Sequence, residues 1–192
     1  MVDVAGGRAP GTQVSEHMCA FYNGSDALLD IVADYLSAGL RAGNKCFCMI
    51  DTPSSVRSRI PGDLALHRAD MLHILTEDEG YMPDGNFSKD TFIRTMESMV
   101  TEAIGQGYER FRAVGDESFI VRNGVDINEW FAAEAELNRI VPEHPHFFFC
   151  LYDLELFDGD TVMHVLRTHP TVYVNGTIIT NPSYIREEQP TG

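Results

Sequence analysis

The sequence feature that most constrains the fold lies in residues 17–51, where two short apolar runs flank an amphipathic stretch. The runs, 18–22 and 46–50, have the length and composition of buried strands. Between them apolar residues recur at helical spacing over residues 28–40, and Gly43 stands where such a helix would end. This order of strand, helix and strand predicts a βαβ unit.

A βαβ unit places its two strands in parallel, because the intervening helix returns the chain to the starting edge of the sheet. Helices cover both faces of such a sheet, which explains why both runs are continuously apolar. Ser25 or Asp26 is expected to cap the start of the helix. Ligands of open parallel sheets bind outside the carboxyl ends of the strands, so function is expected at that edge.

The rest of the chain continues the α/β pattern and ends in a hairpin. Further strands are expected at residues 72–75, 111–115 and 146–152, helices at 56–60, 88–105, 126–140 and 161–168, and a polar loop at 76–85. Asn175-Gly176 stands between two β-rich runs, which predicts an antiparallel hairpin at one edge of the sheet. We therefore predict a single domain over residues 16–185, with a flexible leader (1–15) and a flexible tail (186–192).

Composition excludes several classes of function. The net charge of −15, from 29 acidic and 14 basic residues, disfavours contact with nucleic acid or an anionic membrane surface, since both require a basic footprint. The first 16 residues lack the basic flank and apolar core of a signal peptide, and no apolar run could span a bilayer. The four cysteines fall in predicted buried strands, where free thiols are usual in a reducing compartment. We therefore expect a cytoplasmic protein that binds neither nucleic acid nor membranes directly.

Several separate motifs resemble those of one known family and occur in the order expected for it. They are HMCAFY (17–22), AGLRAGNKC (38–46), YMPDG (81–85), CLYD (150–153), RTHP (167–170) and NPSY (181–184). The resemblance covers roughly residues 16–184, nearly the whole region expected to fold. The sequence thus resembles the MEDS family, the methanogen/methylotroph sensory domain first described in a dichloromethane-responsive repressor.

The resemblance implies a fold similar to RecA and the circadian-clock ATPases. That fold has three layers, with a mostly parallel central sheet and helices on both faces, to which the pattern above adds a C-terminal β-hairpin. The resemblance also implies signal transduction, because domains of this family look like small-molecule sensors coupled to DNA-binding, kinase or anti-sigma-type partners. No output domain is evident in these 192 residues, so a stand-alone module that signals through a separate protein is expected. A second copy of the same chain, in a homodimer, is also considered as a partner.

Nucleotide binding, the second hypothesis, is weakened by the loop after the first strand. A phosphate-binding loop requires several glycines, a lysine for the phosphates and a Ser or Thr for magnesium. Here the loop is only NGSD (23–26), without a lysine, and Asp26 adds negative charge where a phosphate would meet the helix N-terminus. A degenerate RecA-like nucleotide-binding protein remains an alternative, and a nucleotide is a disfavoured cofactor.

A metal- or thiol-based redox sensor is the third hypothesis. His17 and Cys19 are two residues apart on a strand, so their side chains share one face and are candidate metal ligands. Cys150 would join them if the two strands are neighbours, and His169 would complete a set. The alternative is that these residues belong to the core, because buried free thiols are common and usually inert. A bound metal is therefore left open as a cofactor.

Charged residues at or near strand ends are candidates for ligand binding. Asp116, Glu117 and Asp153 follow strands at the expected ligand edge, where carboxylates orient magnesium or water, or else cap the next turn. Arg112 lies inside an otherwise apolar strand. Because a buried guanidinium is costly unless paired, we expect Arg112 to reach Glu117 or Glu134, or to face a pocket, unless its strand is an exposed edge.

Aromatic side chains are candidates for the apolar wall of a pocket, although most serve the core. The ligand-binding set predicted from the sequence is Tyr22, Asn23, Arg112, Glu117, Tyr152 and Asp153. No Gly-x-Ser-x-Gly elbow occurs and no Ser or Cys has a visible base partner, so no catalytic residue is assigned and enzymatic activity is not favoured. The leading hypothesis is a cytoplasmic sensory domain that binds a small organic ligand and acts in transcriptional, two-component or anti-sigma-type regulation through a protein partner.

Overall fold

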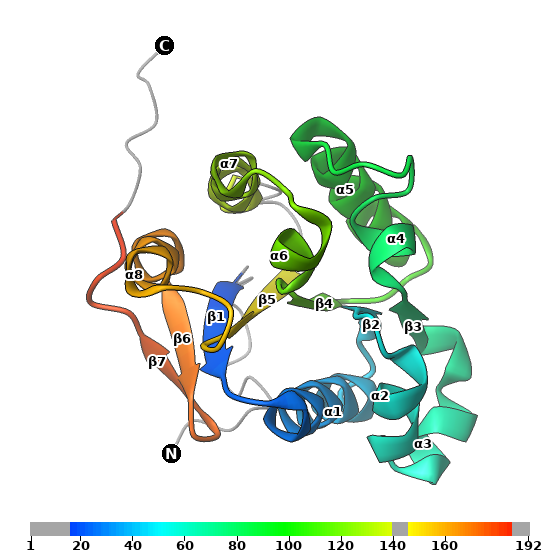
Figure 1. Cartoon of the computed structure of the whole chain (residues 1–192). Helices are drawn as coiled ribbons and strands as arrows, with labels where there is room; N and C mark the ends of the chain where they lie inside the picture. Colours follow the sequence, from blue (N-terminus) through cyan, green and yellow to red (C-terminus); the bar gives the residue numbers. More distant parts are fainter. Residues whose placement is uncertain (1–15, 140–145, 186–192) are drawn as a thin grey trace.

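The computed structural model describes residues 16–139 and 146–185, and a seven-stranded sheet forms its middle layer (Figure 1). The strands are β1 (Glu16–Tyr22), β2 (Lys45–Met49), β3 (Leu72–Leu75), β4 (Phe111–Asp116), β5 (His146–Asp153), β6 (Thr171–Val174) and β7 (Thr177–Thr180). Their order across the sheet is β3-β2-β4-β5-β1-β6-β7. All neighbours are parallel except β6 and β7, so the predicted mostly parallel sheet with a C-terminal hairpin is confirmed.

Helices cover both faces of the sheet, as predicted (Figure 1). One face carries α1 (Ser25–Arg41), α2 (Pro53–Arg59) and α3 (Gly62–His67); the other carries α4 (Glu77–Gly80), α5 (Lys89–Gly105), α6 (Phe119–Asn123), α7 (Ile127–Leu137) and α8 (Gly159–Thr168). A short 3-10 helix, η1 (Ala69–Met71), precedes β3. Alternate residues of each central strand enter one of two hydrophobic cores, one under α1 and one under α5 and α7, which is why the strands are apolar throughout.

The opening βαβ unit forms, but its helix begins differently from the prediction. Gly24 is the N-cap of α1, and neither Ser25 nor Asp26 caps it with a side chain. The backbone of Gly24 has a φ of 81°, a conformation open to glycine but costly for other residues. Asp26 instead pairs with Arg59 at the end of α2. At the other end Gly43, with a φ of 76°, follows the last turn as predicted.

Short elements account for most of the remaining differences. The sequence does not predict α3, α4, α6 or η1, because three to six residues are too few to display helical periodicity. Residues 76–85, expected to be a polar loop, contain α4, whose start is held by a capping box between Thr76 and Glu79. The hairpin forms at Asn175-Gly176, both with positive φ, as the turn signal requires. The predicted leader and tail lie outside the described residues.

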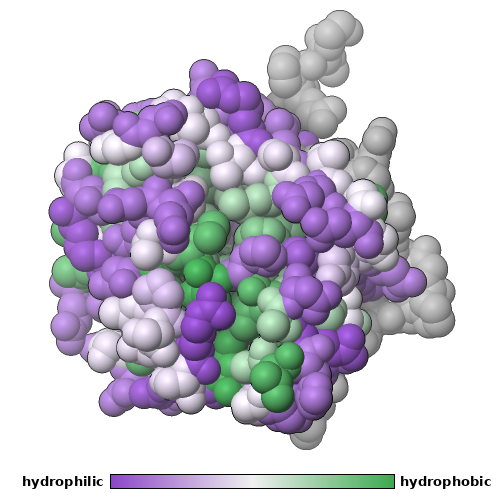
Figure 2. Space-filling view, turned by 90° about the vertical axis from the view of Figure 1, so that its right-hand side faces the viewer, coloured by the Kyte–Doolittle hydropathy of each residue, from purple (hydrophilic) through white to green (hydrophobic). Residues whose placement is uncertain are grey.

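One edge of the sheet is accompanied by an apolar strip at the surface. Figure 2 shows the side of the molecule that carries β3, where hydrophobic residues gather between hydrophilic ones. β3 is the edge strand there, and Leu66 on α3 is 76% exposed, the highest value among the exposed large hydrophobic side chains of the described segments. No helix of the described residues is long and apolar enough to cross a bilayer.

Candidate functional site

A buried group of ionisable side chains lies between the sheet and α7. It consists of His17 on β1, Glu134 on α7, Cys150 on β5 and His169 directly after α8, and we call it the His/Cys/Glu cluster. One potential ligand atom from each residue lies within 4.8 Å of the others. Glu134 Oε2 is central, at 2.8 Å from His17 Nε2, 3.2 Å from His169 Nε2 and 3.8 Å from Cys150 Sγ. All four side chains are buried, so their charges and lone pairs must be satisfied within the protein.

The strand register explains why these residues meet. β1 and β5 are parallel neighbours in which Cys19 pairs with Cys150, so the two cysteines and His17 face the same side of the sheet. α7 packs on that side and brings in Glu134. β6 pairs with β1 on the other flank, and the turn that enters β6 carries His169. Four segments distant in sequence thus contribute one side chain each.

Both imidazole rings are held by their outer nitrogens. His17 Nδ1 lies 3.2 Å from Asn138 Oδ1, and His169 Nδ1 lies 2.8 Å from the carbonyl oxygen of Val165. Asn138 donates its amide group to the carbonyl of Thr168, which turns its oxygen toward His17. Each Nδ1 therefore faces an oxygen outside the cluster, while each Nε2 faces Glu134 Oε2.

Glu134 also accepts a hydrogen bond from β5, and that donor is in turn bound from α7. The hydroxyl of Tyr152 donates to Glu134 Oε1, and Trp130 Nε1 donates to Tyr152 Oη at 3.0 Å. Burial alone would raise the pKa of Glu134, but His169 and His17 outweigh it and hold that pKa well below its usual range. Burial, reinforced by Glu134 and Glu117, raises the pKa of the Cys150 thiol. The cluster therefore contains a carboxylate and a thiol in contact.

A small cavity adjoins the cluster on the sheet side of α5 and α7. It offers about 10 Å³ to the centre of a water molecule, room for roughly one water, and its wall includes Met49, Tyr81, Met96, Glu117, Trp130 and Cys150. Glu117 Oε1 accepts a hydrogen bond from the Tyr81 hydroxyl at 3.2 Å, and Oε2 has no partner among the described residues. Burial, with Glu134 and Asp116 nearby, raises the pKa of Glu117 well above its usual range, which favours its neutral form.

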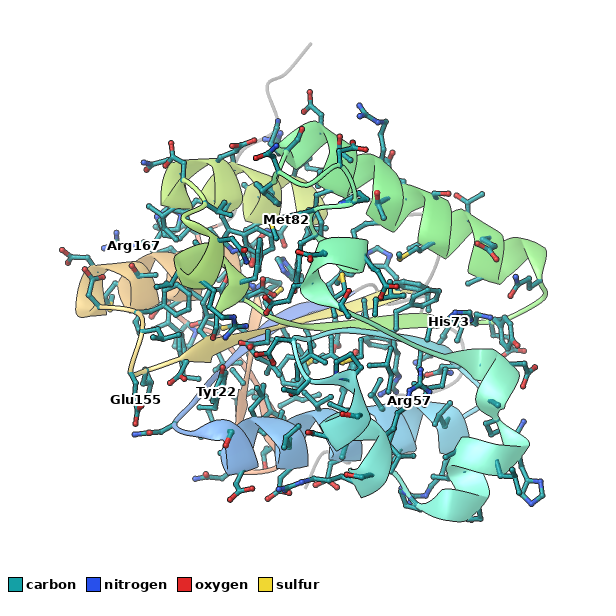
Figure 3. The ribbon with its side chains drawn as sticks, turned by 45° about the vertical axis from the view of Figure 1, so that its right-hand side comes forward. Tyr22, Arg57, His73, Met82, Glu155 and Arg167 are labelled. Atoms are coloured by element: carbon teal, nitrogen blue, oxygen red, sulfur yellow. The ribbon has the colours of Figure 1, made fainter. Side chains whose placement is uncertain are left out.

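The carboxyl edge of the sheet, where the sequence predicts the ligand site, is already paired internally. Tyr22 donates to Asp116 Oδ1 at 2.8 Å, and Arg122 on α6 bridges Asp116 and Glu77. Asp153 accepts from the backbone amide of Glu155, the turn-capping alternative considered above. Figure 3 shows Tyr22 and Glu155 at the same end of the sheet. This edge therefore presents satisfied side chains.

The predicted set of ligand-binding residues is split between different places in the fold. Tyr22 and Asp153 lie at the carboxyl edge and Asn23 is exposed beside them, whereas Glu117 and Tyr152 lie under α7. The structure does not bring these residues together into one pocket.

The prediction that Arg112 reaches Glu117 or Glu134 is wrong. Its Nε donates to Asn44 Oδ1 at 2.6 Å, and its guanidinium lies over the ring of Tyr35 on α1. Odd and even residues of β4 point to opposite faces, so Arg112 faces α1 while Glu117 faces α7. The edge-strand alternative is also wrong, because β4 lies between β2 and β5.

Replacing Arg112 with methionine is expected to lower the free energy of unfolding by about 1–3 kcal/mol, because Asn44 Oδ1 would remain buried without a donor. Small-molecule or metal binding under α7 should not change, since the side chain lies on the other face of the sheet. Urea unfolding and the binding measurements described below check both statements. The double variant with Asn44→Leu serves as a control, because it removes the unpaired acceptor and should recover part of the loss; ligand binding that disappears in Arg112→Met would contradict the placement.

Of the predicted metal ligands, the structure brings His17 and Cys150 together with His169, while Cys19 lies outside the set. Cys19 pairs with Cys150 in register and faces the same side, but its sulfur is not among the atoms within 4.8 Å. The sequence reasoning considered Glu134 only as a partner for Arg112. A signal was present: Glu134 is four residues after Trp130 and three before Leu137, on the apolar face of its helix.

Comparisons with known proteins show where this sequence has relatives. The family described as MEDS, MEthanogen/methylotroph, DcmR Sensory domain, matches residues 16–170. The transcriptional repressor DcmR of Methylorubrum extorquens is 26% identical over 161 residues, which cover 82% of this chain and 59% of the repressor. EssC (ATPases 2 and 3) from Geobacillus thermodenitrificans superposes with a TM-score of 0.47 at 9% identity, over 82% of this chain and 31% of that one. The chain thus spans less than two thirds of either protein.

Proposed function

The chain belongs to the MEDS family of sensory domains, and from that premise we propose that it binds a small organic molecule beside Glu117 and signals to a protein partner. Its relationship to a transcriptional repressor supports a sensory and regulatory role. The observation that carries the proposed binding site is the unpartnered Oε2 of Glu117 in the wall of a mostly apolar cavity.

The chemistry of this cavity limits the ligand. Small-molecule sites combine apolar walls with a few polar groups that fix orientation, and here the walls are aromatic rings and thioethers. A neutral Glu117 offers one O–H donor, and leaving a buried polar group unpaired costs about 1–3 kcal/mol. A ligand with an acceptor oxygen or nitrogen would recover that energy. The site therefore suits a molecule of a few heavy atoms, mostly apolar, with one hydrogen-bond acceptor.

The cavity is small, and its walls determine how it would enlarge. Met49 and Met96 are unbranched side chains that adopt alternative shapes at low cost. Trp130 on α7 belongs to the same wall, so a ligand that enlarges the cavity displaces α7 relative to the sheet. We propose that a partner protein recognises this displacement of α7. Because the net charge of −15 opposes direct contact with DNA, the partner is expected to be a protein that carries the regulatory output.

A thermal-shift screen with one- to four-carbon alcohols, aldehydes, ketones and nitriles tests the proposal. A ligand at 100 times its Kd is expected to add about 2.7 kcal/mol to the free energy of unfolding. Glu117→Leu removes the donor at nearly constant volume and should abolish the shift. Asp153→Asn is the matched control at the carboxyl edge and should leave it unchanged.

Two results would count against the binding site. If no compound stabilises the wild type, the proposal loses its support. If Asp153→Asn abolishes the shift and Glu117→Leu does not, the ligand binds at the carboxyl edge instead.

A further inference from the structure

We propose that the His/Cys/Glu cluster binds one divalent transition-metal ion, for which Zn²⁺ is the best match. The site is separate from the proposed ligand cavity except that Cys150 borders both. The inference rests on three features of the cluster: the spacing of its donor atoms, the orientation of its imidazoles and its charge balance.

The spacing of the donor atoms matches a tetrahedral centre. Metal–ligand bonds of about 2.0–2.3 Å to nitrogen, oxygen and sulfur place tetrahedral ligand atoms ~3.3–3.8 Å apart. His17 Nε2 lies 3.3 Å from Cys150 Sγ, and His169 Nε2 lies 3.2 Å from Glu134 Oε2. His17 Nε2 and Glu134 Oε2 are closer, at 2.8 Å, so one of them would move outward by a few tenths of an ångström. No pair exceeds 4.8 Å.

The imidazoles are oriented as metal ligands usually are. A ligating histidine binds through one nitrogen while its other N–H donates to an oxygen that fixes the ring, and here Asn138 and the Val165 carbonyl supply those oxygens. Both Nε2 atoms point at Glu134 Oε2, so without a metal a proton must lie between them and the carboxylate, and a metal ion would replace that proton. His169 Nε2 is fully buried, and its 3.2 Å contact with Glu134 Oε2 does not have the geometry of a hydrogen bond. A metal ion bound by the two Nε2 atoms and Glu134 would satisfy all three groups at once.

The charges balance when the ion is divalent. Glu134 as a carboxylate and Cys150 as a thiolate contribute two negative charges, and two neutral imidazoles contribute none. A dication therefore makes a neutral site, which buried surroundings favour because an unpaired charge there is costly. Two nitrogens, one sulfur and one oxygen form a mixed, partly soft donor set that suits Zn²⁺ and disfavours Mg²⁺ or Ca²⁺.

All four donors come from the protein and are buried, so the coordination sphere is closed. Closed zinc sites are structural, whereas catalytic sites keep a position for water. The ion would join α7 and the end of α8 to β1 and β5, and would thereby fix the elements that flank the proposed ligand cavity. Metal occupancy would therefore set whether α7 can respond to a ligand.

Metal titration of the full chain, stripped with a chelator, tests the proposal. Elemental analysis after equilibration with Zn²⁺ and desalting should give one ion per chain, and the thermal unfolding midpoint should rise. Co²⁺ used as a spectroscopic probe should give an intense thiolate-to-cobalt band in the near ultraviolet and visible bands of tetrahedral strength. The cobalt spectrum is measured on the wild type, so it does not depend on whether a variant folds.

Matched variants assign the ligands. Cys150→Ser should remove the thiolate band, while Cys19→Ser, its register partner on the same face, should keep it. Asn138→Ala should weaken binding by about 10–100-fold through loss of the outer hydrogen bond. His169→Gln should weaken it at least as much, and His164→Gln, which changes a histidine stacked on Phe131 outside the cluster, should not.

Two outcomes would overturn the site. One is a stripped wild type that takes up no stoichiometric metal and shows no shift, which leaves the cluster as a set of ion pairs and hydrogen bonds only. The other is a thiolate band that survives Cys150→Ser. Glu117→Leu should retain metal binding, so failure of the metal site and failure of the ligand site are distinguishable.

Discussion

Replacing Trp130 with alanine is expected to lower the free energy of unfolding by about 3–5 kcal/mol, one of the two largest losses we predict. The indole is fully buried on α7, and its ring packs against four others: Tyr81, Phe87, Phe92 and Phe119, at centroid distances of 5.8, 5.6, 5.3 and 5.2 Å. Its removal leaves a cavity among rings that cannot collapse easily, and it also deprives Tyr152 of a hydrogen-bond donor.

The measurement is urea unfolding followed by circular dichroism, because Trp130 is the single tryptophan of the chain and fluorescence would be lost with it. Trp130→Phe keeps a ring in place and should cost less than the alanine variant. Phe131→Ala, at the next and only half-buried position of α7, is the control and should cost less than Trp130→Ala. If both alanine variants lose the same free energy of unfolding, the contacts of the indole with the surrounding rings contribute no more to stability than those of Phe131.

Replacing Gly115 with alanine is the second large effect, with an expected loss of about 1–3 kcal/mol or more from overpacking. A Cβ at this position of β4 would lie 1.8 Å from Tyr81 Oη and 3.0 Å from Glu117 Oε1. Tyr81 cannot simply move aside, because its ring is stacked on that of Phe119 with 3.9 Å between the ring centroids. Its hydroxyl also donates a hydrogen bond to Glu117. Alanine normally stabilises a strand relative to glycine, so the loss of stability expected here is opposite to the usual effect of this substitution.

Two comparisons isolate the cause of this effect. Gly105→Ala, at the last residue of α5 with no atom within 4 Å of the new Cβ, should be neutral or stabilising. Tyr81→Phe removes the clashing oxygen, so Gly115→Ala should cost less in that background, and the two effects should be non-additive. An additive double variant would mean that the hydroxyl is not what excludes a side chain at position 115.

Local patterns were enough to predict the larger elements. β3 and the hairpin turn match the prediction, and α5 begins after its predicted N-cap Ser88, because strand composition, turn residues and caps act over a few neighbouring residues. The predicted N-cap of α1 was wrong. Gly24, with a positive φ, occupies the N-cap position, and neither Ser25 nor Asp26 caps the helix with its side chain. Helices of three to six residues were missed because they are shorter than two turns of periodicity.

The sequence predicted some members of the His/Cys/Glu cluster and missed others. The shared face of His17 and Cys19 follows from the two-residue period of a strand, and Cys150 was expected to join them if β1 and β5 were neighbours. Glu134 was not recognised as a member of the cluster. It lies on the buried face of α7, and which side chains it contacts depends on the strands that face this helix. Arg112 was assigned to the wrong side, because burial of a charge predicts a partner but not which one.

The sequence by itself thus determined the α/β class, the parallel opening unit, the closing hairpin and the family resemblance, since each depends on periodicity or on contiguous motifs. Only the tertiary structure decided that four side chains up to 152 residues apart meet at one carboxylate, because strand order and register decide which residues face each other. The sites that we propose lie in the interior under α7 and not at the carboxyl edge that the sequence predicts. There Glu117 Oε2 is buried without a hydrogen bond, and a polar atom without a partner is costly only where water cannot reach it.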